Sequence, residues 1–476
     1  MSARRTRNTR PLTALLAAGA VGLGLLGVPT GLAAAEPNTA RQTPTAGSLT
    51  AGDTLFPTVG NGGYDVRHYA INLRYARSGS ITARTTIRAK AKKPLSSFSL
   101  DLEGLQVDRV RVDGRRASYI RRADKLVITP ARPVRGTFRT TVAYHGKPVT
   151  HIDPDGAKDG WIPTSDGATV VAEPVGAMTW FPNNNTPRDK ASFRVAVNAP
   201  ASLEVAGNGV LKKRKHGART TWTWTQRQPM ATYLAMISIA DYDVYRSTMT
   251  TTTGRKLPLW SFIEPALGSQ AEARALIPRA IRFGERRYGP YPFDSAGVVI
   301  KNTDVGYALE TQTRPVFDGP TDESTIIHEF AHQWYGNSVT PKDWGDIWLN
   351  EGFATYAEWQ WAAAHGGLST AEQFRKDYRD NPASAGVWNP APAKLIDPAD
   401  LFGQSSYLRG SMTLEVLRQE VGARDFARIL RRWADRYEGR STSTRAFIRL
   451  SERVSGEQLD DLFDAWLYTP GKPPLS

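Results

Sequence analysis

Alternating hydrophobic and polar residues fill the first half of the chain and predict β-strands. Runs with a hydrophobic residue at every second position begin near Tyr69, Phe98, Phe138 and Phe193, and Gly, Pro or Asp bounds each run. Successive side chains of a strand point to opposite faces, so such a run places one hydrophobic face against a core. We therefore predict an antiparallel, sandwich-like β-domain over residues 55–247.

The hydrophobic period changes near residue 265 and indicates helices from there to the end of the chain. We predict helices over residues 271–287, 321–335 and 353–364, and further helical segments after Ser405. A Pro-rich connection over residues 381–398 predicts an irregular loop that covers a cleft. The fold class is thus α+β, with residues 248–476 forming a second, mainly α-helical domain.

The first 35 residues differ from both domains. Four Arg residues precede an uncharged stretch rich in Leu, Ala and Gly, and the small residues Ala33–Ala35 follow it. This order is typical of a secretory signal peptide cleaved near Ala35, and we expect residues 36–54 to be a linker. A retained membrane anchor is the alternative, although Pro29 interrupts the apolar stretch. The sequence predicts a secreted protein and leaves both the Sec and the twin-arginine export routes open.

Composition narrows the chemistry further. The 476 residues are 40% hydrophobic and 22% charged, which is typical of globular domains. The absence of Cys excludes disulfides, thiolate metal ligands and a Cys nucleophile. The net charge of +15 is spread along the chain, and no segment resembles a nucleic-acid-binding module. We therefore expect a monomer that binds no nucleic acid and inserts into no membrane.

One short motif carries recognisable metal chemistry. His328 and His332 lie four residues apart in a predicted helix, so both imidazoles face one ion, while Glu329 faces a water on that ion. Eighteen residues separate His332 from Glu351, which begins the next predicted helix and can supply a third ligand. Two imidazoles and a carboxylate favour zinc, and three protein ligands leave a fourth position for water. The spacing therefore predicts one catalytic Zn²⁺ bound by His328, His332 and Glu351, with Glu329 as general base.

These residues, with the Asn and Gly that flank Glu351, resemble the gluzincin metallopeptidases, and more closely the aminopeptidase N family. Further similar segments are Trp180–Pro182, Lys190–Phe193, Tyr288–Phe293, Trp334–Asn337 and Trp466–Tyr468. The resemblance covers residues 55–476. It implies that the helical domain is a thermolysin-like catalytic domain.

The resemblance also implies two carboxylates that bind the amino group of a peptide. Glu310 matches the family's amine-binding Glu on an edge strand, although Tyr307, Leu309 and Thr311 replace the usual Gly, Met and Asn. Glu173, in the β-domain, matches a second anchor. Fixed carboxylates that bind the substrate's ammonium group would present only the first peptide bond to the metal.

Two further residues complete the predicted site. Tyr407 matches a family Tyr that donates to the developing oxyanion, within a segment similar to Tyr-x-Lys-Gly. Glu358 lies seven residues beyond Glu351, on the same helix face, and we expect it to orient a ligand histidine. The residues near Glu173, the segment 307–310 and parts of the loop 381–400 would line the substrate pocket.

Together these features predict a secreted, zinc-dependent aminopeptidase that acts on peptides. Metal-activated water would attack the first peptide bond, Glu329 would accept its proton, and Tyr407 would stabilise the oxyanion. Two alternatives remain at this stage: an endopeptidase of the thermolysin type, and a catalytically silent binding scaffold.

Overall fold

The computed structural model describes residues 43–215 and 217–475. The predicted signal peptide and the linker as far as residue 42 lie outside the described residues. Thr45 and Ala46, in the described end of that linker, form a short strand that pairs with the segment 95–97.

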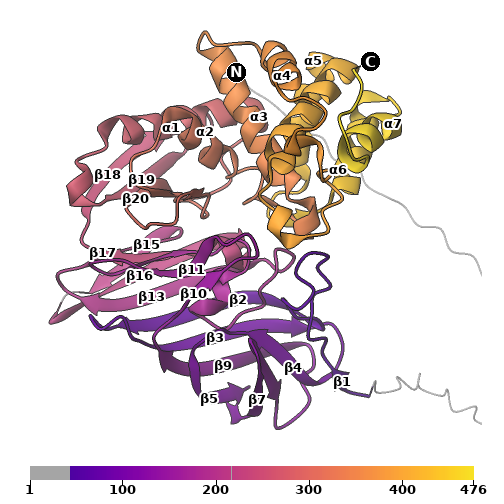
Figure 1. Ribbon diagram of the computed structural model, residues 1–476. Helices are drawn as coiled ribbons and strands as arrows, with labels where there is room; N and C mark the ends of the chain where they lie inside the picture. Colours follow the sequence, from indigo (N-terminus) through magenta and orange to yellow (C-terminus); the bar gives the residue numbers. More distant parts are fainter. Residues whose placement is uncertain (1–42, 216, 476) are drawn as a thin grey trace, which may run out of the picture. The chain divides into compact units, whose positions relative to one another are not determined.

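Three sheets build the β-domain (Figure 1). The eight-stranded sheet consists, in spatial order, of β15 (Val210–Lys215), β16 (Arg219–Met230), β13 (Ala191–Pro200), β2 (Tyr64–Tyr75), β3 (Ile81–Ala91), β9 (Thr137–Gly146), β5 (Gln106–Val112) and β6 (Arg115–Arg116). The four-stranded sheet consists of β1 (Thr45–Ala46), β4 (Leu95–Asp101), β8 (Lys125–Thr129) and β7 (Ser118–Arg122). The five-stranded sheet consists of β10 (Thr150–Ile152), β11 (Lys158–Pro163), β12 (Ala168–Val171), β17 (Ile237–Ala240) and β14 (Glu204–Gly207).

The predicted alternation produces the core of this domain. Tyr69, Ile71 and Leu73 of β2 are buried, and exposed or half-buried residues separate them. The ring of Tyr69 stacks on Phe193 of β13 at 4.8 Å and meets the edge of Phe181 at 5.5 Å. The strands are largely antiparallel as predicted, but β2 and β13 pair in parallel.

The second domain contains a sheet as well as helices. Its strands are, in spatial order, β18 (Asp243–Thr250), β19 (Lys256–Ile263), β20 (Ala296–Lys301), β22 (Val316–Asp318) and β21 (Ala308–Leu309), and β23 (Val339–Pro341) pairs separately with β24 (Arg440–Thr442). The predicted domain boundary after residue 247 falls within β18, and its exact position stays a prediction.

The helices follow the predicted pattern with shifted ends. They are α1 (Ala271–Tyr288), α2 (Glu323–Ala331), α3 (Trp348–Ala364), α4 (Thr370–Asp380), α5 (Gly410–Arg436), α6 (Thr444–Ser455), α7 (Asp460–Phe463) and the π-helical turns Ser405–Arg409 and Asp464–Tyr468. Short 3-10 turns lie at Gly176–Thr179, Thr232–Leu234, Pro265–Leu267, Trp344–Asp346, Gly386–Trp388 and Pro398–Asp400. The helix predicted to Tyr335 ends at Ala331, and the helix predicted from Phe353 begins earlier, at Trp348. Within the described part of the chain, no helix has the length and apolarity needed to span a membrane.

Lys190 joins the β-domain to the catalytic domain. Its ammonium group donates to the backbone oxygens of Asn337 at 2.7 Å and Ser338 at 2.8 Å, and to the Thr340 hydroxyl at 2.7 Å. These acceptors are neutral, so burial lowers the pKa of Lys190 to about 7. Because Asn337 lies five residues after His332, this contact fixes the β-domain close to the predicted metal ligands.

Candidate active site

Two helices bring the predicted metal ligands together. His328 lies on α2, His332 caps its C-terminal end, and Glu351 lies in the first turn of α3. Glu351 Oε2 is 3.3 Å from His328 Nε2 and 3.5 Å from His332 Nε2. Donors bound tetrahedrally at zinc distances lie roughly 3.3–3.5 Å apart. The donor set and its spacing therefore fit one zinc ion.

Both imidazoles are oriented from behind. His328 Nδ1 lies 2.7 Å from Glu358 Oε1, and His332 Nδ1 lies 3.1 Å from the backbone oxygen of Tyr335. A proton on each Nδ1 satisfies these acceptors and leaves each Nε2 free for a metal. The predicted contact of Glu358 with a ligand histidine is thus present.

The charges of the three ligands support one another. Burial alone would raise the pKa of Glu351, but His332 and His328 together lower it to about 2. Burial likewise opposes the charged form of His328, whereas its contacts with Glu351 and Glu358 raise its pKa well above the usual value. Glu351 is therefore ionised in this pocket, as a metal ligand must be.

Glu329 points into the same space without a partner. It is buried, and its Oε2 has no hydrogen-bond partner among the described residues. Burial raises the pKa of Glu329 to about 8, although the two imidazoles oppose that shift. A bound metal cation would add a further opposing charge. A free carboxylate oxygen beside the predicted metal ligands would be able to accept a proton from a water bound to the metal, as a general base must.

Glu310 and Glu173 converge on the ligands from two domains. Glu310 follows β21, while Glu173 follows β12 of the β-domain. Both are buried, and one oxygen of each has no partner in the described part of the chain. Carboxylate oxygens of Glu173, Glu310 and Glu351 lie within 4.8 Å of one another. Burial and the charge of Glu310 raise the pKa of Glu173, so a cation placed between the two would be strongly favoured.

Asp159 of β11 positions the loop that carries Glu173. Its Oδ2 accepts hydrogen bonds from the backbone nitrogens of Val175 at 3.3 Å and Gly176 at 2.8 Å. Two bonds from consecutive amides fix the direction of the chain directly after Glu173.

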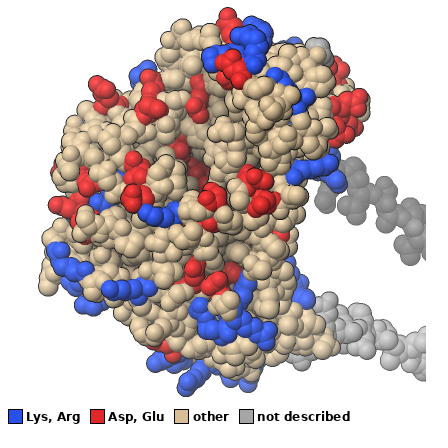
Figure 2. All heavy atoms as spheres, in the orientation of Figure 1, with Lys and Arg blue, Asp and Glu red and all other residues tan. Residues whose placement is uncertain are grey.

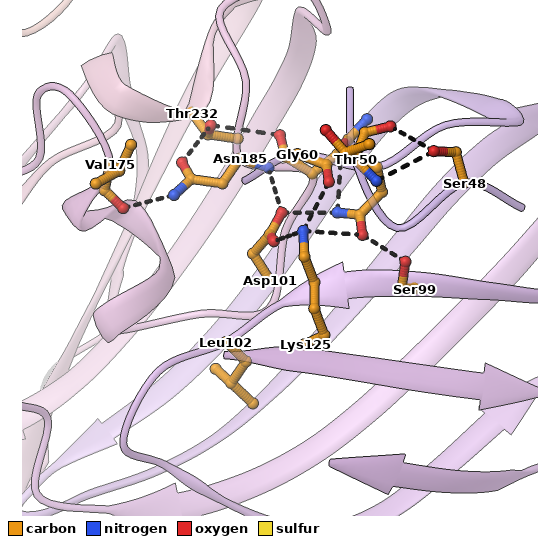
Figure 3. A network of polar contacts seen from close by, with 12 residues as sticks. Ser48, Thr50, Gly60, Ser99, Asp101, Leu102, Lys125, Val175, Asn185 and Thr232 are labelled. Atoms are coloured by element: carbon orange, nitrogen blue, oxygen red, sulfur yellow. Dashed lines mark hydrogen bonds and ion pairs between the residues drawn. The ribbon is translucent and has the colours of Figure 1, made fainter. Parts of the chain in front are cut away.

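A buried polar network supports the same loop from the other side (Figure 3). The Asn185 side chain donates to the backbone oxygen of Val175 and accepts from the Thr232 hydroxyl at 3.3 Å. The Asn185 backbone nitrogen donates to Asp101 Oδ2 at 3.0 Å, and Lys125 forms an ion pair with the same carboxylate. The loop is therefore attached to strands β4 and β8 of the β-domain.

Tyr407 lies over the metal ligands. It belongs to the π-helical turn Ser405–Arg409, and its ring is 6.0 Å from that of His328 with an angle of 21° between their planes. Burial and then the charge of Glu351 raise the pKa of Tyr407 well above the usual value. The phenol consequently keeps its proton and can donate a hydrogen bond.

Two glycines allow the helices that carry Glu351 and Tyr407 to touch. A Cβ atom on Gly352 would lie 2.8 Å from the backbone carbonyl carbon of Gly410, closer than real Cβ atoms come to backbone. Gly352 follows Glu351, and Gly410 lies three residues after Tyr407. The absence of side chains at these positions allows the turn that carries Tyr407 to lie close to the helix that carries Glu351.

We expect Gly352→Ala to destabilise the protein by roughly 1–3 kcal/mol because the added methyl group forces α3 away from Gly410. Ala in a helix is normally about 1 kcal/mol better than Gly, so a loss would isolate the packing effect. The turn that carries Tyr407 would shift and kcat would fall. Urea unfolding and kinetics test this, with Gly386→Ala as control because a Cβ there meets nothing within 4 Å. Unchanged stability of Gly352→Ala would contradict the expectation.

The cavity over these residues has a wall that sequence reasoning missed. Beside the ligands and the predicted anchors, it is lined by Asp153, Asp155 and Ala157 of the β10–β11 hairpin, and by Phe402. The predicted lining from the loop 381–400 is wrong, since none of its residues faces the cavity. Figure 2 shows Asp and Glu side chains gathered around a hollow on the face that it displays.

Fold and site together define a zinc metallopeptidase built from a β-domain and a catalytic domain. The family model described as the peptidase M1 N-terminal domain matches residues 66–234, and that of the peptidase family M1 domain matches residues 301–466. The chain belongs to peptidase family M1. This confirms the predicted family, the α+β fold class with its helical catalytic domain, and one catalytic Zn²⁺ as cofactor.

The solved relatives match this chain over nearly their whole length, whereas the curated relatives are much longer than the matched region. An M1 zinc metallopeptidase from Deinococcus radiodurans is 29% identical with a TM-score of 0.80, over 90% of this chain and 98% of that one. A variant of that peptidase bound to a Tyr-Ser-Ala substrate is 29% identical with a TM-score of 0.81, over 90% of this chain and 100% of the other. Aminopeptidase M1-C of Oryza sativa subsp. japonica is 25% identical over 72% of this chain and 40% of its own length. Aminopeptidase N of Caulobacter vibrioides is 26% identical, over 64% of this chain and 38% of its own length. The chain thus spans about 40% of the length of these curated relatives.

Proposed function

We propose that this protein is a zinc aminopeptidase that removes residues one at a time from the amino ends of peptides. The observation that carries the proposal is the convergence of Glu173 and Glu310 next to the metal-binding set, two buried carboxylates that each have one oxygen without a hydrogen-bond partner among the described residues. The names of the curated relatives, and the Tyr-Ser-Ala peptide bound to the two-domain relative, support it.

Each residue of the site has a defined task in this reaction. Glu173 and Glu310 would bind the ammonium group of the peptide and so place its first carbonyl carbon beside the metal. His328, His332 and Glu351 would hold the zinc, which when bound supplies a Lewis acid and an acidified water. Glu329 Oε2 would accept the proton of that water and pass it to the departing amine.

Tyr407 would act at the carbonyl oxygen. Its hydroxyl stays protonated in this pocket and would donate a hydrogen bond to the oxygen as negative charge develops there. Such a donor is worth about 2.7–4 kcal/mol in comparable sites.

Acetylation of the substrate's amino group should greatly slow cleavage. The cap removes the positive charge and leaves Glu173 and Glu310 buried without a partner, which costs about 2–5 kcal/mol. The value of kcat/KM should therefore fall by a factor of roughly 30 to several thousand. The measurement compares one peptide with a free or acetylated amino end, and its C-terminally amidated form is the control that should be cleaved normally. Cleavage of the capped peptide at internal bonds would show that the protein is an endopeptidase. Zinc binding without cleavage of any peptide would show that it is a catalytically silent scaffold.

We also propose that the chain is exported and acts as a monomer. Support for export comes from the basic, apolar and small-residue order of residues 1–35, while a monomer is the default assumption. Amino-terminal sequencing of protein recovered outside the cell and its mass in solution test the two statements. An intact N-terminus or a dimer mass would refute them.

A further inference from the structure

A second group of metal-ligating side chains lies in the wall of the cavity. It consists of His151, Asp153 and Asp159, from the β10–β11 hairpin of the β-domain, and one ligand atom of each lies within 4.8 Å of the others. None of the three belongs to the catalytic set. Of these three residues only Asp153 lines the cavity, so a water or an ion could reach the group from the side of Asp153.

The two carboxylates are buried, and each has one oxygen without a hydrogen-bond partner in the described part of the chain. Asp153 is 7% exposed and Asp159 is 0% exposed, and the Oδ1 atom of each has no hydrogen-bond partner among the described residues. The ion pairs found in the described part of the chain give neither of them a Lys or Arg partner; Asp153 Oδ1 lies 3.9 Å from His151 Nε2. Buried carboxylates without a partner cost several kcal/mol, and a bound cation offsets that cost.

His151 is prepared to act as a ligand. Its Nδ1 lies 2.8 Å from Glu103 Oε2, so the imidazole donates its proton to Glu103, and Nε2 lies 3.9 Å from Asp153 Oδ1. Glu358 stands in the same relation to His328 at the catalytic site, at 2.7 Å. A carboxylate behind a histidine raises the basicity of the opposite nitrogen, as at known metal sites.

We propose that His151, Asp153 and Asp159 bind a second divalent metal ion of the zinc type, separate from the catalytic zinc. Two carboxylates balance the charge of a dication, and an imidazole with two oxygens is a donor set that zinc accepts. Water from the cavity would complete the coordination on the side of Asp153.

The ion would be linked to the substrate site through Asp159. Its Oδ2 accepts from the backbone nitrogens of Val175 and Gly176, which follow Glu173, while its Oδ1 is the free atom. An ion on the free oxygen would stiffen the loop that carries the amine anchor. This consequence rests on the proposed function, whereas the binding of the ion does not.

Zinc content measures the proposal directly. The purified protein is dialysed against Zn²⁺ and the metal is counted by mass spectrometry, with two ions per chain expected for the wild type. His151→Asn and Asp153→Asn should each retain one. Asp155→Asn is the matched control, since Asp155 lies on the same hairpin and lines the same cavity but is outside the group; it should retain two. Glu103→Gln should lower the affinity for the second ion by about 10–100-fold.

Three results would overturn the proposal. The wild type could bind only one zinc, Asp155→Asn could lose the second ion as well, or His151→Asn and Asp153→Asn could keep it. Thermal unfolding shows whether each variant is folded. Should the ligand variants fail to fold, Glu103→Gln decides alone, because it leaves all three ligands in place. Peptidase activity is not needed for any of these readouts, so a failure here is distinct from a failure of the proposed function.

Discussion

Glu329→Gln is expected to keep its zinc and to lose hydrolysis, with kcat lower by about 10²–10⁴-fold. The amide has the size of the carboxylate but cannot accept a proton from water. Because Glu329 Oε2 makes no hydrogen bond in the described structure, the substitution breaks no existing contact of that atom. The loss would therefore report chemistry and not folding. Zinc content and kcat on a fluorogenic aminoacyl substrate are the two measurements.

Glu323→Gln is the matched control for this experiment. Glu323 begins the same helix α2, is exposed, and accepts from Trp361 Nε1 at 2.9 Å, which an amide oxygen can also do. Its kcat should equal that of the wild type. A Glu329→Gln protein that retained kcat within tenfold would show that another group takes the proton.

Arg409→Ala is expected to cost more than about 4 kcal/mol of stability. The Arg409 side chain is 0% exposed, and burial without a carboxylate lowers its pKa to about 10. Its guanidinium donates to four backbone oxygens: Trp388 at 2.6 Å, Trp466 at 2.9 Å, Ala465 at 3.0 Å and Thr469 at 2.6 Å. Each carbonyl left unpaired would cost about 1–3 kcal/mol.

Urea unfolding measures the loss, and Arg428→Ala provides the comparison. Arg428 is exposed, and its one ion-pair partner among the described residues is Asp425, three residues before it, so its removal should change stability by no more than about 0.5 kcal/mol. Arg409→Lys should recover a fraction of the loss, because an ammonium group can serve only some of the four oxygens. A loss below 1 kcal/mol for Arg409→Ala would mean that water replaces the guanidinium.

The metal site could be predicted from the sequence because its residues lie close together along the chain, on two neighbouring helices. Two histidines four apart need only a helix to converge, and Glu358 needs only the same helix as Glu351 to face His328. The β-strands can be predicted equally well, since Tyr69, Ile71 and Leu73 show the two-residue period of a half-buried strand.

The wall of the cavity could not be predicted, because it depends on contacts between distant segments. Asp153 and Asp155 lie more than 150 residues before the ligands, in a turn that reads as an ordinary polar hairpin. Arg409 was identified only as part of a family segment, whereas its partners belong to the loop 381–398 and the end of the chain. The sequence predicts that this loop lines the substrate pocket, whereas in the structure its residue Trp388 accepts a hydrogen bond from Arg409.

The altered residues around Glu310 have structural explanations. The hydroxyl of Tyr307, at a position where the family resemblance implies Gly, donates to the backbone oxygen of Lys158 at 2.7 Å and so attaches the segment to the β10–β11 hairpin. The hydroxyl of Thr311 donates to the backbone oxygen of Arg314 at 2.6 Å and closes the following turn. The backbone oxygen of Glu310 itself accepts a hydrogen bond from Asn337 Nδ2 at 2.6 Å.

Because Glu173 is attached to the β-domain, the proposed selectivity for the end of a peptide and the proposed cleavage chemistry depend on different domains. In the proposed reaction, bond cleavage would depend on groups carried by α2, α3 and the turn around Tyr407, whereas the preference for the end of a peptide would depend on Glu310 together with Glu173, which comes from the other domain. A small rotation of one domain against the other would then move Glu173 relative to Glu310 and alter that preference. Selectivity for chain ends is, on this view, a property of the junction at Lys190 as much as of the metal.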